Sequence, residues 1–296
     1  MPVYEAAYRR WDREGERRGV PALAIAAAMI RRVMRLRLVR LIVLVVPSLA
    51  CFFSFIVFYA VYDDMLAMVV RQTGGEGFNL LHLVNQQFLL SAIWFGALIA
   101  ALAGAPLIAE DRKAHALPLY FSKPITHLDY VAGKVLTVAT FVALLLLVPP
   151  VLMYLVDVML SKQENVAAAQ LPSLLRSLVP GACAVLLFST LSLAVSAVSR
   201  RPAYAALAFL GTFVLAGALA HVLVRGLHEF GWMAVSPVHC TFKISSEVLP
   251  LPDLPPVFGR FVTRLDVGLA WAGFGAWTAL SVAVVAARVR RVEVVS

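Results

Sequence analysis

The chain has 296 residues, of which 61% are hydrophobic and only 15% are charged, with a mean hydropathy of +0.84. Soluble domains are nearer half apolar and a quarter charged, so this composition excludes a soluble globular enzyme, a disordered regulator and a fibrous protein. The formal net charge of +9 would suggest nucleic-acid binding in a soluble chain. In a chain this apolar, the position of the basic residues relative to membrane spans has to be considered first.

The first 40 residues form a polar tail followed by a short apolar segment. Residues 1–18 are dense in Arg and Glu and are not followed by the short apolar core and cleavage site of a secretory signal. Residues 22–30 are apolar but too few to cross a bilayer, which takes about 20 residues. They lead into a basic cluster made of Arg31, Arg32, Arg35, Arg37 and Arg40.

Six segments are long and apolar enough to span a membrane as helices. They are 41–62, 87–109, 135–156, 178–198, 203–224 and 267–287. The sequence therefore predicts an all-α membrane protein with a six-helix transmembrane domain over residues 41–290. None of the six segments contains Asp, Glu, Lys or Arg, which disfavours a proton- or sodium-coupled transporter and chemistry inside the membrane.

The charges between these segments divide unequally between the two sides of the membrane. The side with both termini holds 19 of the 26 Lys and Arg residues and 8 of the 17 acids, a net charge of +11. The other side holds 7 basic residues and 9 acids, a net charge of −2. Because basic loops stay in the cytoplasm, both termini are predicted to be cytoplasmic.

The longest extracytoplasmic stretch is 225–266. It contains five prolines, yet Phe230, Trp232 and Met233 are too apolar for a free loop, so a re-entrant or interfacial helical piece near 225–236 is expected. His228, His239 and Cys240 share this stretch and leave an external metal site open as an alternative to plain surface residues. Elsewhere the spacing of His with His or Glu fits no zinc motif, and no nucleophile elbow or phosphate-binding loop occurs, so no metal, cofactor or ATP site is predicted.

The most informative stretch follows the second predicted span, at 110–125. It begins with two acids and two bases, Glu110 to Lys113, and continues as an amphipathic turn or short helix that Lys123-Pro124 ends. The apolar side of this turn is formed by Leu117, Tyr120 and Phe121. A rigid element of this kind suits docking into the groove of a partner protein, and an ordinary loop under the bilayer is the alternative.

This stretch resembles the loop between spans two and three of ABC-2 type ABC transporter permeases. That loop reads E-E-x-x-x-G-T-L-E-x-L-L-x-x-P-[IV], with G-K just before span three. His115 and Ala116 replace Gly-Thr here, and Pro118 replaces an acid. The matching residues are Glu110, Asp111, Leu117, Leu119, Phe121, Pro124, Ile125, Gly133 and Lys134.

The resemblance extends over nearly the whole chain after residue 20 and implies a function. It implies a basic interfacial elbow helix at 22–40, a cytoplasmic coupling helix after span two, a re-entrant segment between spans five and six, and a bacterial inner-membrane location. Such a chain is the permease subunit of a type V exporter-like transporter that works by alternating access. ATP and magnesium are then bound by a separate ATPase subunit, and a second permease copy or a paralogue completes the transporter.

The resemblance also implies roles for individual residues. Glu110, Asp111, Arg112 and Lys113 would anchor the coupling helix at the membrane edge, while Leu117, Tyr120 and Phe121 would insert towards the ATPase. The elbow arginines would lie on anionic lipid headgroups, and the same charges would orient the chain. Small residues of the fifth span are candidates for the permease dimer interface or for packing within one subunit, namely Gly211, Ala216, Gly217 and Ala220.

Two other classes remain as alternatives. The first is a non-transport membrane anchor or assembly subunit of a redox or maturation complex, for which paired histidines inside the spans would be expected and are not present. The second is a membrane-embedded lipid-modifying enzyme, for which Glu110-Asp111 is the only acidic cluster at the membrane surface.

Overall fold

The computed structural model describes residues 20–41, 45, 80–116, 120, 125–160, 165–249 and 264–290. This part of the chain is helical and contains no strand. It includes five stretches of helix long and apolar enough to cross a membrane, at Ala92–Lys113, His127–Met159, Ala167–Val198, Pro202–Leu227 and Val267–Val289. These correspond to the second to sixth predicted spans, and the first, 41–62, lies outside the described residues apart from residues 41 and 45.

Two of the five stretches are interrupted. The first consists of α3 (Leu80–Ile99), a five-residue π-helix (Ala100–Gly104) and α4 (Ala105–Lys113), with Pro106 in the first turn of α4. The second is divided at Leu147 into α6 (His127–Leu146) and α7 (Val148–Leu160). Because a proline removes one backbone donor and clashes with the preceding turn, the break at Leu147 is where Pro149-Pro150 predicts it.

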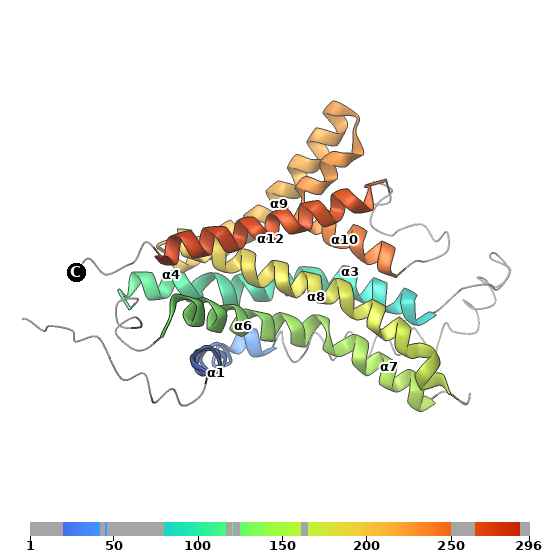
Figure 1. Cartoon of the computed structure of the whole chain (residues 1–296), viewed down its shortest axis with the longest axis horizontal. Helices are drawn as coiled ribbons and strands as arrows, with labels where there is room; N and C mark the ends of the chain where they lie inside the picture. Colours follow the sequence, from blue (N-terminus) through green and yellow to red (C-terminus); the bar gives the residue numbers. More distant parts are fainter. Residues whose placement is uncertain are drawn as a thin grey trace, which may run out of the picture.

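The third stretch, α8 (Val166–Val198), is the central helix of the bundle. It contacts α3, α4, α6, α7, α9 (Pro202–Leu227) and α12 (Val267–Arg290) (Figure 1). It begins twelve residues before the predicted fourth span, and its first turns lie in the segment 157–177, where Val166, Leu171 and Leu174 suit one side of a short amphipathic helix. Its buried side includes Leu187, Phe188 and Leu193, which are completely covered.

The segment between α9 and α12 folds back onto the bundle. It forms a 3-10 helix (Phe230–Val235) and α10 (Pro237–Val248), which packs on α12 and α8. The indole of Trp277 donates a hydrogen bond to the carbonyl of Val235 (3.0 Å), and Gly273 lets the backbone of Ala234 approach, since a Cβ there would lie 2.6 Å from its oxygen. A helical piece in this region is what the apolar residues predicted, although most of it follows residue 236.

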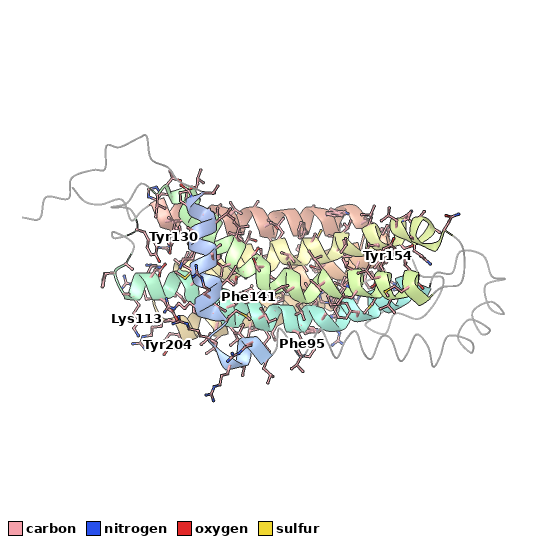
Figure 2. The ribbon with its side chains drawn as sticks, turned by 90° about the horizontal axis from the view of Figure 1, so that it is seen from below. Phe95, Lys113, Tyr130, Phe141, Tyr154 and Tyr204 are labelled. Atoms are coloured by element: carbon pink, nitrogen blue, oxygen red, sulfur yellow. The ribbon has the colours of Figure 1, made fainter. Side chains whose placement is uncertain are left out.

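The elbow segment lies across the bundle. In Figure 2, α1 (Pro21–Val33) crosses the other helices instead of running along them, and a turn at 34–36 separates it from helical residues 37–41. Its apolar side packs on α6 and buries Ile25, Met29 and Val33. At this end of the bundle α4, α8 and α12 finish and α6 and α9 begin, and we call it the α1 end.

Candidate functional site

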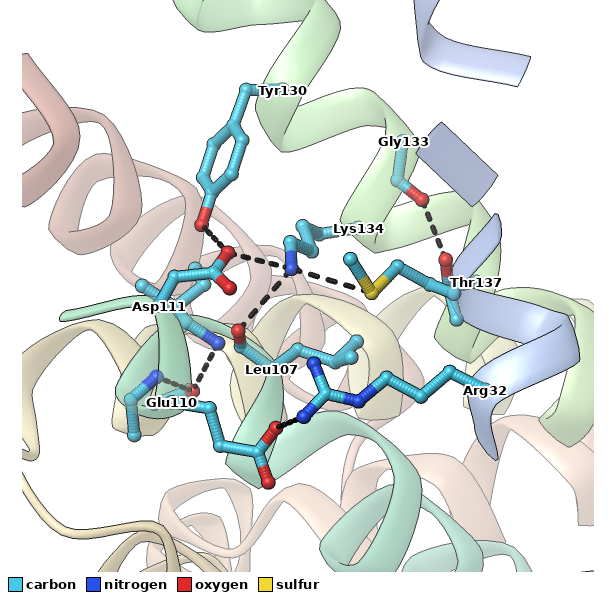
Figure 3. Close-up of polar contacts among 12 residues, drawn as sticks. Arg32, Leu107, Glu110, Asp111, Tyr130, Gly133, Lys134 and Thr137 are labelled. Carbon is cyan, nitrogen blue, oxygen red and sulfur yellow. Dashed lines mark hydrogen bonds and ion pairs between the residues drawn. The ribbon is translucent and has the colours of Figure 1, made fainter. Parts of the chain in front are cut away.

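A buried ion pair joins α4 to α6 at the α1 end. The ammonium of Lys134 lies 2.8 Å from Oδ2 of Asp111, and the two side chains are 0% and 7% exposed (Figure 3). The sequence put Lys134 just before a span that starts at residue 135. The helix in fact begins at His127, so Lys134 lies two turns inside it.

Both charges of this pair have further polar partners. Lys134 also donates to the carbonyl of Leu107 (3.2 Å) and approaches the sulfur of Met29 (3.7 Å), so its three protons point at acceptors on α4 and α1. The Tyr130 hydroxyl donates to the same carboxylate oxygen of Asp111 at 2.7 Å. A buried ion pair needs this degree of satisfaction, because the cost of removing two charges from water otherwise exceeds their attraction.

Two tyrosine rings surround the ammonium. Its nitrogen lies 5.4 Å from the ring centre of Tyr130 and 6.0 Å from that of Tyr120, within the range of cation–π attraction. The two rings are 5.3 Å apart. Burial and the Asp111 carboxylate raise the pKa of the Tyr120 phenol.

Gly133 brings α1 close to this pair. A Cβ added to Gly133 would lie 2.8 Å from Cβ of Ile25 and 2.9 Å from the carbonyl oxygen of Ala22, so only glycine fits under α1. The neighbouring Lys134 can then reach Met29 on the same helix. The Gly-Lys pair thus has two separate packing functions: the glycine admits α1 and the lysine joins α1, α4 and α6.

A second, exposed ion pair joins α1 to α4. Arg32 lies 2.8 Å from Glu110, with side chains 60% and 39% exposed. The adjacent acids Glu110 and Asp111 therefore bind different helices, α1 on the surface and α6 in the interior. We call the five side chains the ion-pair cluster: Arg32, Glu110, Asp111, Tyr130 and Lys134.

The end of α4 is also fixed to α8. The hydroxyl of Ser196 accepts hydrogen bonds from the amides of Ile108 and Ala109 in α4, at 3.0 Å each. Arg112 donates to the carbonyl of Ala197 near the end of α8. The predicted anchor residues thus attach α4 to three neighbouring elements, while Lys113 is exposed.

The end of α4 also explains why glycine is usual at the position of His115 in the resemblance. His115 has φ 50°, in the left-handed region that favours glycine. The amide of Ala116 bonds back to the carbonyl of Asp111 (2.9 Å), the pattern of a glycine-type helix terminus. The substitution by His therefore keeps this terminus.

The remaining predicted residues of this segment are described only in part. Tyr120 is half-buried against Tyr130, and Leu117 and Phe121 lie outside the described residues. The elbow arginines are all exposed, and Arg32 is the one that pairs with an acid among the described residues. Sequence reasoning missed Tyr130 and the burial of Lys134, and the Gly-Lys pair next to a tyrosine was the available signal.

The four small residues of α9 do not form one free face. Ala216 and Ala220 are buried within the chain, and Gly217 lies against His239 and Ser236 of the α10 region. Gly211 has open space beside it. In this structure, packing within the subunit accounts for three of the four.

The histidines and the cysteine of the segment between α9 and α12 do not converge. His239 packs on the ring of His221, with centres 5.0 Å apart, and Cys240 donates to the carbonyl of Ala234. Burial lowers the pKa of His239 to about 4 and raises that of Cys240 to about 12, so both are neutral at pH 7. Nowhere in the described ranges do three or more His, Cys, Asp or Glu side chains group as metal ligands would.

Comparison with protein families gives one match. Residues 23–236 match the family model described as ABC-2 family transporter protein. The matched region begins in α1, includes the whole ion-pair cluster and ends before α10. Comparison with curated proteins finds no match.

Proposed function

Because the chain belongs to the ABC-2 family of transporter proteins, we propose that it is the permease subunit of an ATP-driven transporter and works with a separate ATPase. The observation that carries the mechanism is the ion-pair cluster. It joins α4 to α6 on either side of the connection 114–126, which contains most of the predicted coupling segment 110–123, and it attaches α1 to both helices. Force applied to that connection would therefore move three helices together.

The orientation follows from the same end of the bundle. The exposed arginines of α1 and the following turn suit a cytoplasmic membrane surface with anionic lipids. We therefore place the α1 end in the cytoplasm, with the segment 41–62 as a sixth span and both termini inside. An ATPase would bind below it, with Leu117 and Phe121 as proposed contacts.

In the transport cycle, ATP binding closes two ATPase subunits and displaces the coupling segments of two permease copies. The bundle then passes from one packing to another, which requires that the ATPase interact differently with the two states. The ion-pair cluster transmits the displacement because its buried members cannot separate without leaving a charge unpaired. We propose export by alternating access as the outcome. Anchoring a redox or maturation complex is the alternative, and no described site favours it.

The exposed pair Arg32–Glu110 allows a test that leaves folding intact. Exposed ion pairs contribute only about 0.2–1 kcal/mol, so Glu110→Lys is expected to insert and fold normally. It places two positive charges side by side between α1 and α4 and should lower membrane-coupled ATP hydrolysis by at least about fivefold. The measurement is the hydrolysis rate of the permease–ATPase complex in lipid nanodiscs, with the permease alone showing none.

The reciprocal exchange is the control. Arg32→Glu combined with Glu110→Lys restores the pair in reverse and should recover most of the rate. Glu229→Lys makes the same charge change on an exposed residue at the other end of the bundle and should leave the rate unchanged. A normal rate in Glu110→Lys, or no recovery in the double variant, would count against coupling through this pair.

A further inference from the structure

An apolar groove opens between α6 and α12, with α8 as its floor. It measures about 100 Å3 and is lined by residues such as Val131 and Val135 of α6, Leu193 of α8, and Val285 and Val289 of α12. Eight of its ten lining residues are apolar. The other two are His127, in the first turn of α6, and Thr190, whose hydroxyl donates to the carbonyl of Leu186 in its own helix (2.8 Å).

The groove belongs to the membrane part of the bundle and reaches its α1 end. Its walls are three of the five span helices, and it extends from Val282 to Val289 in the last turns of α12 and to the first turns of α6. At that depth the solvent is hydrocarbon, and an apolar recess takes hydrocarbon in preference to water. An acyl chain is therefore the chemistry that fits it.

Three arginines gather where the same helices end. The guanidinium of Arg112 donates to the carbonyl of Ala197, and the positive charges of Arg200 and Arg288 both act on it. The two acids beside Arg112 are engaged elsewhere, Glu110 with Arg32 and Asp111 with Lys134. In the described part of the chain no carboxylate forms an ion pair with any of the three arginines.

The arginines and the groove adjoin. Arg288 precedes Val289, a lining residue, and Ala197 lies one helical turn beyond Leu193, another lining residue. We propose that one anionic phospholipid binds here, with its phosphate on Arg112, Arg200 and Arg288 and an acyl chain in the groove between α6, α8 and α12. Guanidinium groups suit this ligand because their paired donors match phosphate oxygens.

The test compares two lipids on the full chain. Native mass spectrometry in detergent measures the binding of added palmitoyl-oleoyl phosphatidylglycerol and of the zwitterionic phosphatidylcholine with the same chains. Phosphatidylglycerol should bind more tightly, and Arg200→Ala with Arg288→Ala should weaken it about 25-fold, since two charges next to an anionic headgroup are lost. Arg176→Ala with Arg225→Ala removes two exposed arginines near the opposite end and should leave the affinity within about twofold.

The groove is tested separately. Ala286→Phe fills it and should weaken the binding of palmitoyl-oleoyl phosphatidylglycerol by at least about tenfold, while glycerol 3-phosphate, which has the phosphate and no acyl chain, should bind as it does to the wild type. Ala287→Phe, on the exposed neighbouring position, should have no effect.

Equal binding of the two lipids, or equal losses in the two arginine variants, would overturn the proposal. The proposal would also be overturned if the variant with Arg200→Ala and Arg288→Ala still bound phosphatidylglycerol but no longer bound the ATPase. The two arginines would then form a protein contact.

Discussion

Replacing Lys134 with Met is expected to destabilise the bundle by about 3–5 kcal/mol, because Asp111 is left buried without its cation. Removing both charges, with Asp111→Asn and Lys134→Met together, should restore most of that stability, since an apolar replacement of a buried ion pair is often neutral. Tyr130 can still donate to the asparagine oxygen. The measurement is the free energy of unfolding in mixed micelles on titration with a denaturing detergent.

The neighbouring exposed lysine supplies the control. Lys113→Met should change the unfolding free energy by no more than about 0.5 kcal/mol, because the side chain of Lys113 is exposed and forms no ion pair with a described residue. If Lys134→Met were as stable as the wild type, the pair would not hold α4 to α6. The same conclusion would follow if the double variant were less stable than the single one.

Replacing Gly133 with Val is expected to lift α1 off α6. The added atoms would overlap Ile25 and the backbone oxygen of Ala22, and a backbone atom cannot turn away as the end of a side chain can. The consequence is measured by the reaction of a maleimide with a cysteine placed at Ala26, which is 5% exposed in α1. We expect labelling at least about tenfold faster than with Gly133, which corresponds to a loss of about 1.4 kcal/mol in the docking of α1.

A matched substitution separates local packing from general damage. Ala132→Val lies on the adjacent, exposed position of α6 and should leave the cysteine at Ala26 protected. Equal labelling in the Gly133 and Ala132 variants would show that close approach at Gly133 is not what docks α1.

Hydropathy predicted the positions of those helices that consist of one long apolar segment. The span expected at 203–224 is observed as α9, Pro202–Leu227, and the span expected at 267–287 as α12, Val267–Arg290. The errors fall where a helix continues past its apolar core. α8 starts at Val166 because the residues preceding 178 continue the helix and pack against α7.

The candidate site was visible only in part for a related reason. A lysine at the edge of an apolar segment is normally predicted to extend its ammonium into water. The sequence does not indicate that Lys134 instead pairs with Asp111, which lies in another helix. The close approach at Gly133 depends on where α1 crosses α6, which is a tertiary property. The resemblance identified Glu110, Asp111, Gly133 and Lys134 as a set, and the structure supplies the contacts that bring them together.

The central claim is that a separate ATPase binds at the α1 end of this permease. The most direct measurement is photo-cross-linking in the assembled complex from benzoylphenylalanine placed at Ala114, which is exposed just after α4, and at Leu227, which is 52% exposed at the other end of the bundle. We expect an adduct with the ATPase from position 114 and none from position 227. An adduct from position 227, or none from position 114 in a complex that hydrolyses ATP, would contradict it.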